Sequence, residues 1–173
     1  MTKNALIQEL TNHIVSLRRY ALVLTRDRQD AEDLVQESLM RAIAAVDSWR
    51  RGSDLRAWLF RIMHNLHISN MRRLQVRGSH KQGGSSAEAA EEPSQMLRIE
   101  VRNVLAALAE LPEAQRQAIT LIAIEDLRYE EAAKILDIPM GTLMSRLARG
   151  REALRQSMDG RKTPTLHVIR SSR

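Results

Sequence analysis

Residues 129–147 read YEEAAKILDIPMGTLMSRL, and this stretch decides the fold of the C-terminal half. The pattern predicts a short helix over 129–136, a tight turn over 137–139, and a second helix that begins near Met140. The small residues Ala132 and Ala133 allow another helix to approach closely. Two helices joined by so short a turn are typical of a helix-turn-helix, whose second helix enters the DNA major groove by its N-terminal residues.

The second of these helices carries polar and cationic side chains suited to DNA. Thr142 and Ser145 can donate hydrogen bonds to phosphates or bases, while Arg146 and Arg149 can neutralise phosphates. Over residues 140–158, arginines outnumber the single acidic residue, Glu152. The alternative is a helical hairpin whose arginines are simply solvated.

The rest of the chain also has helical periodicity. Apolar residues recur at the spacing of a helix over 3–25, over 29–46, and from Leu55 onward. We expect an N-cap at Asp27 or Asp30 for the second of these helices, and at Ser53 or Asp54 for the third. Further helices are predicted over 96–111 and 113–124, with Pro112 in the first turn of the latter.

These elements predict an all-α fold of two small helical domains. The first domain covers 1–74 and the second, with the helix-turn-helix, covers 96–158. Residues 75–95 include Gly83, Gly84 and Pro93 and lack periodicity, which is typical of a flexible linker that lets the domains move. Residues 159–173 are expected to form a disordered tail.

The composition excludes several classes of protein. Of the 173 residues, 43% are hydrophobic and 28% are charged, as in a folded soluble protein, and none is cysteine. Disulfides and thiolate chemistry are therefore excluded. No apolar run is long enough to span a bilayer, so we expect a cytoplasmic protein without membrane insertion. The net charge of +6 favours a polyanionic partner, the alternative being a charge that serves solubility alone.

Nothing in the sequence predicts an enzyme. His64 and His67 are spaced i, i+3 on one predicted helix, but no third ligand stands at a matching position, and we expect both to be solvated. The sequence also lacks a phosphate-binding glycine loop and a nucleophile elbow. We predict no catalytic residue, no metal site and no cofactor.

Four motifs in a fixed order resemble the bacterial extracytoplasmic-function (ECF) RNA polymerase sigma factors. They are DAEDLVQE at 30–37, AWLFRI at 57–62 followed by Asn65, Leu111-Pro112 with Arg116, and the helix-turn-helix. The resemblance covers about residues 8–156. It implies an alternative sigma factor that binds core RNA polymerase and directs promoter-specific initiation, reading an upstream element and helping to melt a downstream one.

The resemblance also implies roles for particular residues. A surface on the 30–42 helix would dock on the clamp coiled coil of the largest polymerase subunit, and the second domain would meet the flap. The polymerase-binding set is Asp30, Asp33, Gln36, Glu37 and Arg41. The set for the downstream, minus-ten element is Trp49, Arg50, Arg51, Phe60, Arg61, Asn65, Arg72 and Arg73. The set for the upstream, minus-thirty-five element is Thr142, Met144, Ser145, Arg146 and Arg149. An anti-sigma factor is an expected partner.

Some features of these sets depart from the family or leave a choice open. Met144 stands where many members carry Arg or Lys, and Ala148 where some carry an aromatic residue, so direct base contacts are fewer. Trp58 lies on the apolar stripe and is expected in the core, whereas Trp49 and Phe60 are candidates for exposed contacts. Two other functions compete: a sigma-like mimic that sequesters an anti-sigma factor, and a one-component repressor that would leave residues 30–65 unexplained.

Overall fold

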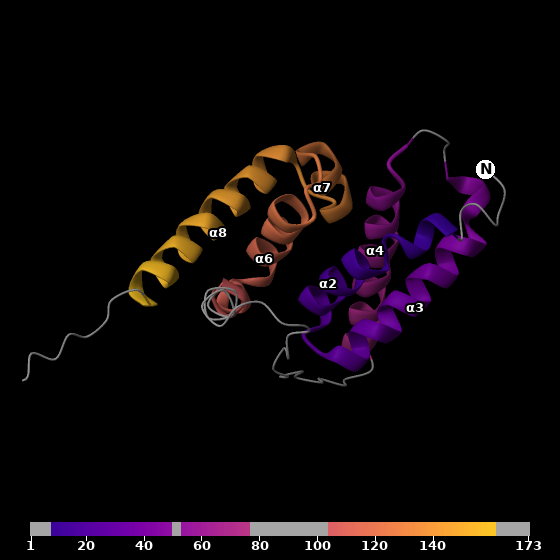
Figure 1. Ribbon diagram of the computed structural model, residues 1–173, viewed down its shortest axis with the longest axis horizontal. Helices are drawn as coiled ribbons and strands as arrows, with labels where there is room; N and C mark the ends of the chain where they lie inside the picture. Colours follow the sequence, from indigo (N-terminus) through magenta and orange to yellow (C-terminus); the bar gives the residue numbers. More distant parts are fainter. Residues whose placement is uncertain (1–7, 50–52, 77–103, 162–173) are drawn as a thin grey trace, which may run out of the picture.

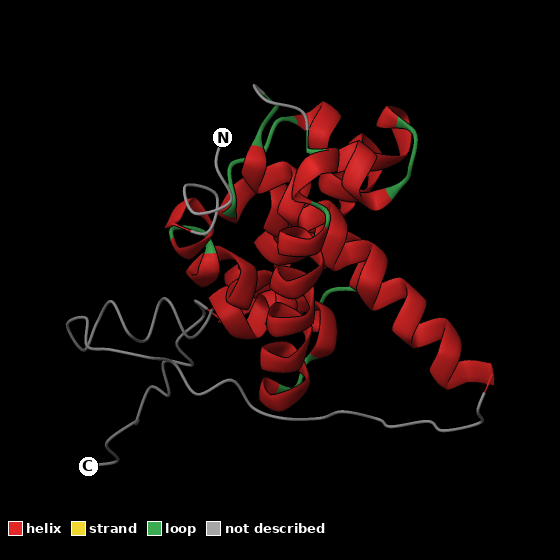
Figure 2. Cartoon of the chain, turned by 90° about the vertical axis from the view of Figure 1, so that its right-hand side faces the viewer, coloured by secondary structure: helices red, strands yellow, loops and turns green. Residues whose placement is uncertain are grey.

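The computed structural model describes residues 8–49, 53–76 and 104–161, and every regular element in these ranges is a helix (Figure 2). The all-α prediction is therefore confirmed. The helices form two units that lie side by side, with α2, α3 and α4 in one and α6, α7 and α8 in the other (Figure 1).

The N-terminal unit follows the predicted order with one break. Its elements are α2 (Ile14–Thr25), α3 (Arg28–Ala44), the short 3₁₀ helix η1 (Val46–Ser48) and α4 (Leu55–Val76). A helical segment at 8–11 is separated from α2 by a turn at Asn12 and His13, so the single helix predicted over 3–25 is interrupted. The segment 1–7 at its start lies outside the described residues.

Two aspartates cap the helices of this unit, as the sequence predicts. The Asp27 carboxylate accepts a hydrogen bond from the Asp30 amide (2.9 Å) and begins α3. The Asp54 carboxylate accepts from the amides of Arg56 (2.9 Å) and Ala57 (3.1 Å) at the start of α4. Each carboxylate satisfies amides that have no partner within their own helix.

The C-terminal unit contains a helical segment at 104–110, then α6 (Glu113–Ile119), η2 (Thr120–Ile124), α7 (Tyr129–Leu136) and α8 (Met140–Arg161). The helix predicted over 113–124 changes type after Ile119, because η2 is a π-helical turn in which the Glu125 amide donates to the Thr120 carbonyl (2.9 Å). Such turns are rare and are found most often at functional positions.

The predicted boundaries between ordered segments shift slightly. Helix α4 continues to Val76, so residues 75 and 76 of the predicted linker are helical, and its remainder, 77–95, lies outside the described residues. Helix α8 continues to Arg161, three residues into the predicted tail, and 162–173 also lie outside the described residues.

A buried apolar core runs through both units. In the first unit Tyr20 and Phe60 are fully buried and meet edge to face, with ring centroids 5.2 Å apart. In the second unit α8 packs closely on α6 at Gly150, where an added Cβ would lie 2.5 Å from Ile119 Cδ1. The units also contact each other, because α4 packs against α7 and α2 packs against α6 and η2.

Candidate polymerase and nucleic-acid interfaces

Helix α3 carries the set of residues predicted to bind the polymerase on one accessible face. Its opposite face is buried in the first unit through Ala31, Leu34, Val35, Ser38 and Ala42. The predicted residues Asp30, Asp33, Gln36 and Arg41 are exposed, and Glu37 is half-buried. They span three turns of helix, so α3 presents a continuous charged surface.

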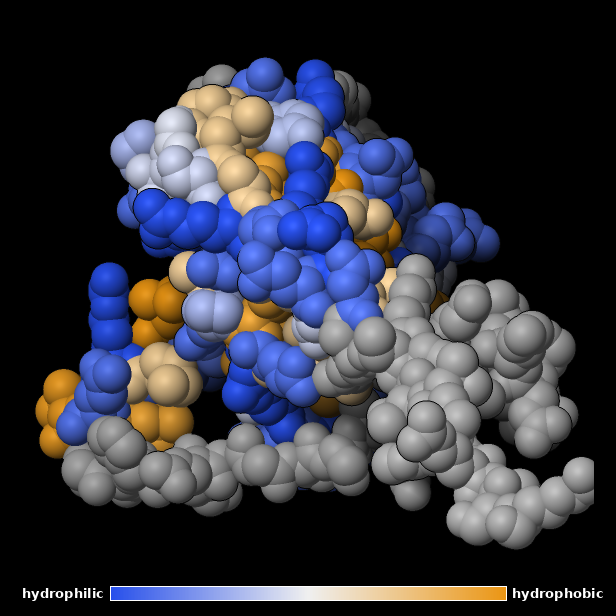
Figure 3. All heavy atoms as spheres, turned by 90° about the vertical axis from the view of Figure 1, so that its left-hand side faces the viewer, coloured by the Kyte–Doolittle hydropathy of each residue, from blue (hydrophilic) through white to orange (hydrophobic). Residues whose placement is uncertain are grey.

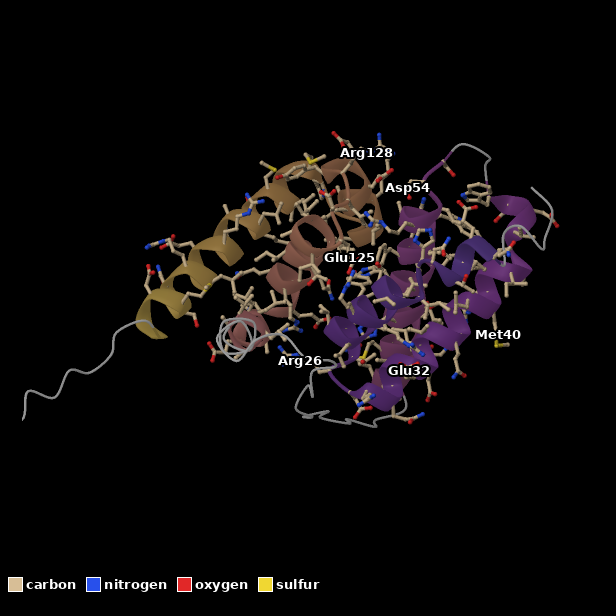
Figure 4. All side chains as sticks on the ribbon, in the orientation of Figure 1. Arg26, Glu32, Met40, Asp54, Glu125 and Arg128 are labelled. Carbon is tan, nitrogen blue, oxygen red and sulfur yellow. The ribbon has the colours of Figure 1, made fainter. Side chains whose placement is uncertain are left out.

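Short-range contacts hold this surface in place. Arg41 Nη2 lies 2.7 Å from Glu37 Oε1, one turn away, and Gln29 Nε2 donates to Asp33 Oδ1 at 3.2 Å. The sequence analysis missed Met40, which is 69% exposed and points away from the body of the molecule among these charged groups (Figure 4). An exposed thioether beside charges is suited to a protein partner, because it adds apolar area that a partner can bury. Its only signal in the sequence is an apolar residue off the buried stripe of α3.

Helix α4 carries part of the predicted minus-ten set along one stripe. Arg61, Asn65 and Arg72 are exposed and fall on the same side of the helix at 100° per residue, while Arg73 is exposed to one side of them. The Ser69 hydroxyl lies in this stripe and donates to the Asn65 carbonyl (2.8 Å), which leaves the Asn65 amide side chain free of that contact. A stripe with two cations around an amide can follow a phosphate backbone and reach a base edge.

Phe60 contradicts its predicted role. Its side chain is fully buried against Tyr20, so the ring has no surface on which an unpaired base could stack. The reason is that α4 is covered by α2 and α3 on one side and by α7 on another, which buries a wider arc of the helix than one apolar stripe indicates.

The two tryptophans are both half-buried. Trp58 packs against the core from the side, and Trp49 does the same at the end of η1. The Trp49 indole nitrogen is buried without a hydrogen-bond partner among the described residues. Arg50 and Arg51, which follow Trp49 in the predicted set, lie outside the described residues.

His64 and His67 are buried, not solvated as expected. His64 Nδ1 lies 3.0 Å from the Tyr20 hydroxyl, and burial, aided by the neighbouring His67, lowers the pKa of His64 to about 4. Burial also lowers the pKa of His67, whose Nε2 lies 3.9 Å from Glu113 Oε1 of the other unit. Among the described residues no group of three or more potential ligands could hold a metal ion. The pair therefore belongs to the packing of the core.

The helix-turn-helix has the predicted bounds. Helix α7 ends at Leu136, Asp137 turns the chain with a positive φ of 51°, and α8 begins at Met140. The Pro139 carbonyl accepts from the amides of Thr142 (3.0 Å) and Leu143 (3.1 Å), which fixes the first turn of α8. Ala132, Ala133, Leu143 and Leu147 are buried between the two helices.

The predicted minus-thirty-five set falls on two sides of α8. Thr142, Ser145, Arg146 and Arg149 share one accessible side, on which Thr142 and Arg146 are half-buried and Ser145 and Arg149 are exposed. Met144 is 51% exposed but lies roughly 160° around the helix from Thr142. The Ser145 hydroxyl donates to the Gly141 carbonyl (2.9 Å), so its oxygen remains available to accept. These four residues form a compact polar and cationic surface, and Met144 is not part of it.

The molecular surface around α8 is mostly hydrophilic, with separate hydrophobic areas (Figure 3). Within the described residues no helix combines the length and the apolar character needed to cross a membrane.

A further polar cluster, between the two units, has no signal in the local sequence. Glu125 follows η2, and its side chain is completely buried, while Arg19 of α2 is 50% exposed and lies 2.9 Å from Glu125 Oε1. Figure 4 shows Glu125 between the two groups of helices. The hydrogen bond to Glu125 raises the pKa of the Arg19 guanidinium, so the pair is charged.

Comparison with known families places both units. The family model of the sigma2 domain of PhyR matches residues 10–64, and the model of sigma-70 region 4 matches residues 102–154. The first match covers α2, α3 and the first half of α4, and the second covers α6 to most of α8. The two matches therefore contain the three surfaces described above.

Relatives extend over most of the chain. It is 36% identical over 151 residues to the ECF RNA polymerase sigma factor EcfG of Rhodopseudomonas palustris strain TIE-1, which covers 87% of this chain and 83% of the relative. It is 36% identical over 137 residues to the ECF RNA polymerase sigma-E factor of Escherichia coli K12, with 72% of each covered.

A solved structure has the same arrangement. The sigma factor RpoE from Bartonella quintana, in a co-crystal with the anti-sigma factor NepR, has a TM-score of 0.75 and 36% identity, with 90% of this chain and 97% of that chain covered. Two sigma-type units in the expected order, and a relative at this identity over most of both chains, show that this chain belongs to the ECF family of RNA polymerase sigma factors.

Proposed function

We propose that this chain acts as an alternative sigma factor, which binds core RNA polymerase and directs initiation at a specific set of promoters. The observation that carries the proposal is the presence of three separate accessible surfaces in one chain of this family. They are the charged face of α3, the stripe on α4 with Arg61, Asn65 and Arg72, and the polar face at the start of α8.

Each surface fits one task in initiation. The acidic residues of α3 complement a basic helical partner and fit the clamp of the polymerase. The stripe on α4 fits the backbone and bases of an opened strand. The start of α8 fits duplex DNA in the major groove, where Thr142, Ser145 and the two arginines contact phosphates and base edges.

An anti-sigma factor is a further proposed partner. The structurally similar RpoE was crystallised with the anti-sigma factor NepR. This chain has the same overall fold, and the likeness therefore supports an inhibitor that binds across the helices of both units.

One observation favours a second function. The family model that matches residues 10–64 is the sigma2 domain of PhyR, and the PhyRSL–NepR complex from Sphingomonas sp. Fr1 shares the fold, with a TM-score of 0.65 at 23% identity. A sigma-like mimic would sequester an anti-sigma factor without binding promoters. The exposed cations Arg61, Arg72 and Arg149 favour the sigma factor, because sequestering a protein does not require them.

Run-off transcription with purified core polymerase tests the proposal. The assay uses a library of promoter fragments, with and without the full chain, and the double variant Asp33→Arg/Glu37→Arg as a control. Template-specific transcripts that require the wild-type chain support the sigma factor. A stable complex with an anti-sigma factor but no transcripts would support the mimic and refute the sigma factor.

A further inference from the structure

The contact between the two units is made largely by arginines. The Arg19 guanidinium binds both carboxylate oxygens of Glu125, with Nε to Oε1 at 2.9 Å and Nη2 to Oε2 at 3.2 Å. Arg56, at the start of α4, donates to the backbone carbonyl of the same Glu125. One residue after the π-helical turn thus holds two arginines of the other unit.

Two further hydrogen bonds cross the same boundary. Arg26 Nη2 donates to the Ala109 carbonyl (2.9 Å), and Arg116 Nε donates to the Val23 carbonyl at 3.4 Å while its Nη1 donates to Leu111 (2.9 Å). Arg26 and Glu125 are labelled in Figure 4, at separate points along the boundary. The four arginines therefore connect the units along their length, and charged hydrogen bonds of this kind are stronger than neutral ones.

This closed arrangement sets the spacing of the two DNA-binding surfaces. Helix α7 contacts α4 on one side and α8 on the other. Packed helices lie 8–10 Å apart, so the start of α8 and the nearest part of α4 are separated by roughly 20 Å. Two promoter elements whose centres are about 25 base pairs apart are separated by about 85 Å along B-DNA, at 3.4 Å per base pair.

We propose that the Arg19–Glu125, Arg56–Glu125, Arg26–Ala109 and Arg116–Val23 contacts form an interdomain latch that holds the free chain closed, and that the latch must open before both units bind one promoter. This inference rests on the proposed function, because only a protein that binds two separated elements needs the opening. The closed form leaves the charged face of α3 exposed, so polymerase can bind to it and then shift the population toward the open form.

The Arg19–Glu125 pair is the contact on which the latch depends most. Without Arg19, the Glu125 carboxylate would stay buried in the closed form with no guanidinium, and an unpaired buried charge is strongly unfavourable. Opening returns the carboxylate to water. Arg19→Ala is therefore expected to raise the ratio of open to closed chains at least tenfold, with each unit still folded.

The neighbouring Arg18 provides a matched control. It is 55% exposed, and its Nε lies 2.9 Å from Glu32 Oε1 on α3. Arg18→Ala thus removes the same charge and a similar ion pair from the same helix, but the pair lies within one unit. We expect Arg18→Ala to leave the distance between the units unchanged.

The natural absence of cysteine makes the measurement direct. Spin labels at Gln29→Cys on α3 and Gln156→Cys on α8, both exposed positions outside the proposed surfaces, report the distance between the units in the full chain. The wild-type chain should give a narrow, short distance distribution. Arg19→Ala should broaden and lengthen it, and the charge swap Arg19→Glu/Glu125→Arg should restore it in part. Far-UV circular dichroism checks that the variants remain helical.

Two results would overturn the latch: a broad, long distribution in the free wild-type chain, or identical distributions for wild type and a folded Arg19→Ala variant. Addition of core polymerase separates this inference from the proposed function. If the variants behave as expected but polymerase neither binds nor lengthens the distance, the latch stands and the sigma-factor function fails. If polymerase supports transcription with a chain that is already open when free, the function stands and the latch fails.

Discussion

Removing Arg146 and Arg149 together should weaken DNA binding by an amount that depends on salt. Both side chains lie on the accessible side of α8 that begins at Thr142. A cation bound to a phosphate of duplex DNA contributes about 0.9 to the slope of log affinity against log salt. Arg146→Ala/Arg149→Ala should therefore reduce the slope by about 1.8. Between 50 and 200 mM salt, this difference corresponds to roughly a tenfold smaller loss of affinity for the variant than for the wild type.

The assay is equilibrium binding of the full chain to a labelled duplex over a salt series, followed by fluorescence anisotropy. No knowledge of the promoter sequence is needed, because phosphate contacts do not depend on the bases. Arg155→Ala is the matched control, since Arg155 lies on the same helix but is paired with Glu152 (2.7 Å) and Asp159 (3.0 Å). If the double variant and Arg155→Ala have the same slope as the wild type, α8 does not bind DNA through this surface.

Three further predictions concern the polymerase surface, the packing of α8 and the buried histidine. Asp33→Arg/Glu37→Arg should abolish binding to core polymerase with the fold unchanged, and undiminished affinity in a pull-down would disprove the α3 surface. Gly150→Leu should destabilise the chain by about 1–3 kcal/mol in urea unfolding, because Ile119 already occupies the space, whereas Gly141→Leu, in open surroundings, should not. The lowered pKa of His64 means that protonation favours the unfolded chain, so stability should be complete above pH 6.5 and fall by about 3 kcal/mol as the pH drops toward 4. His64→Gln should flatten that fall in urea titrations, and an unchanged pH dependence would assign it to other groups.

Features that depend on local chemistry were predictable from the sequence. The helix-turn-helix was predicted because its periodicity, its turn and its small residues lie within one short stretch. The start of α3 at Asp27 and of α4 near Asp54 follow from capping, which involves residues two or three positions apart. The accessible face of α3 follows from the same periodicity.

Features that depend on contacts between distant segments were not predictable. Phe60 and His64 read as partly polar or exposed positions of an amphipathic helix, but α4 is covered from more than one side and buries them. The Arg19–Glu125 pair joins residues 106 positions apart. No periodicity or motif connects two such residues, and each alone is indistinguishable from a solvated surface charge.

The π-helical turn at Thr120–Ile124 makes the position of Glu125 a matter of chain length as well as residue identity. A π turn accommodates a residue that an α-helix would not, since its hydrogen bonds span five residues in place of four. Deleting one residue from 120–124 would let α6 continue as an α-helix and would rotate everything after it by about 100° relative to α2. Glutamate could then be retained in the sequence while its carboxylate no longer faced Arg19. Within the family, a one-residue gap at this place in an alignment would thus distinguish chains that share this contact from chains that do not, even where every charged residue is the same.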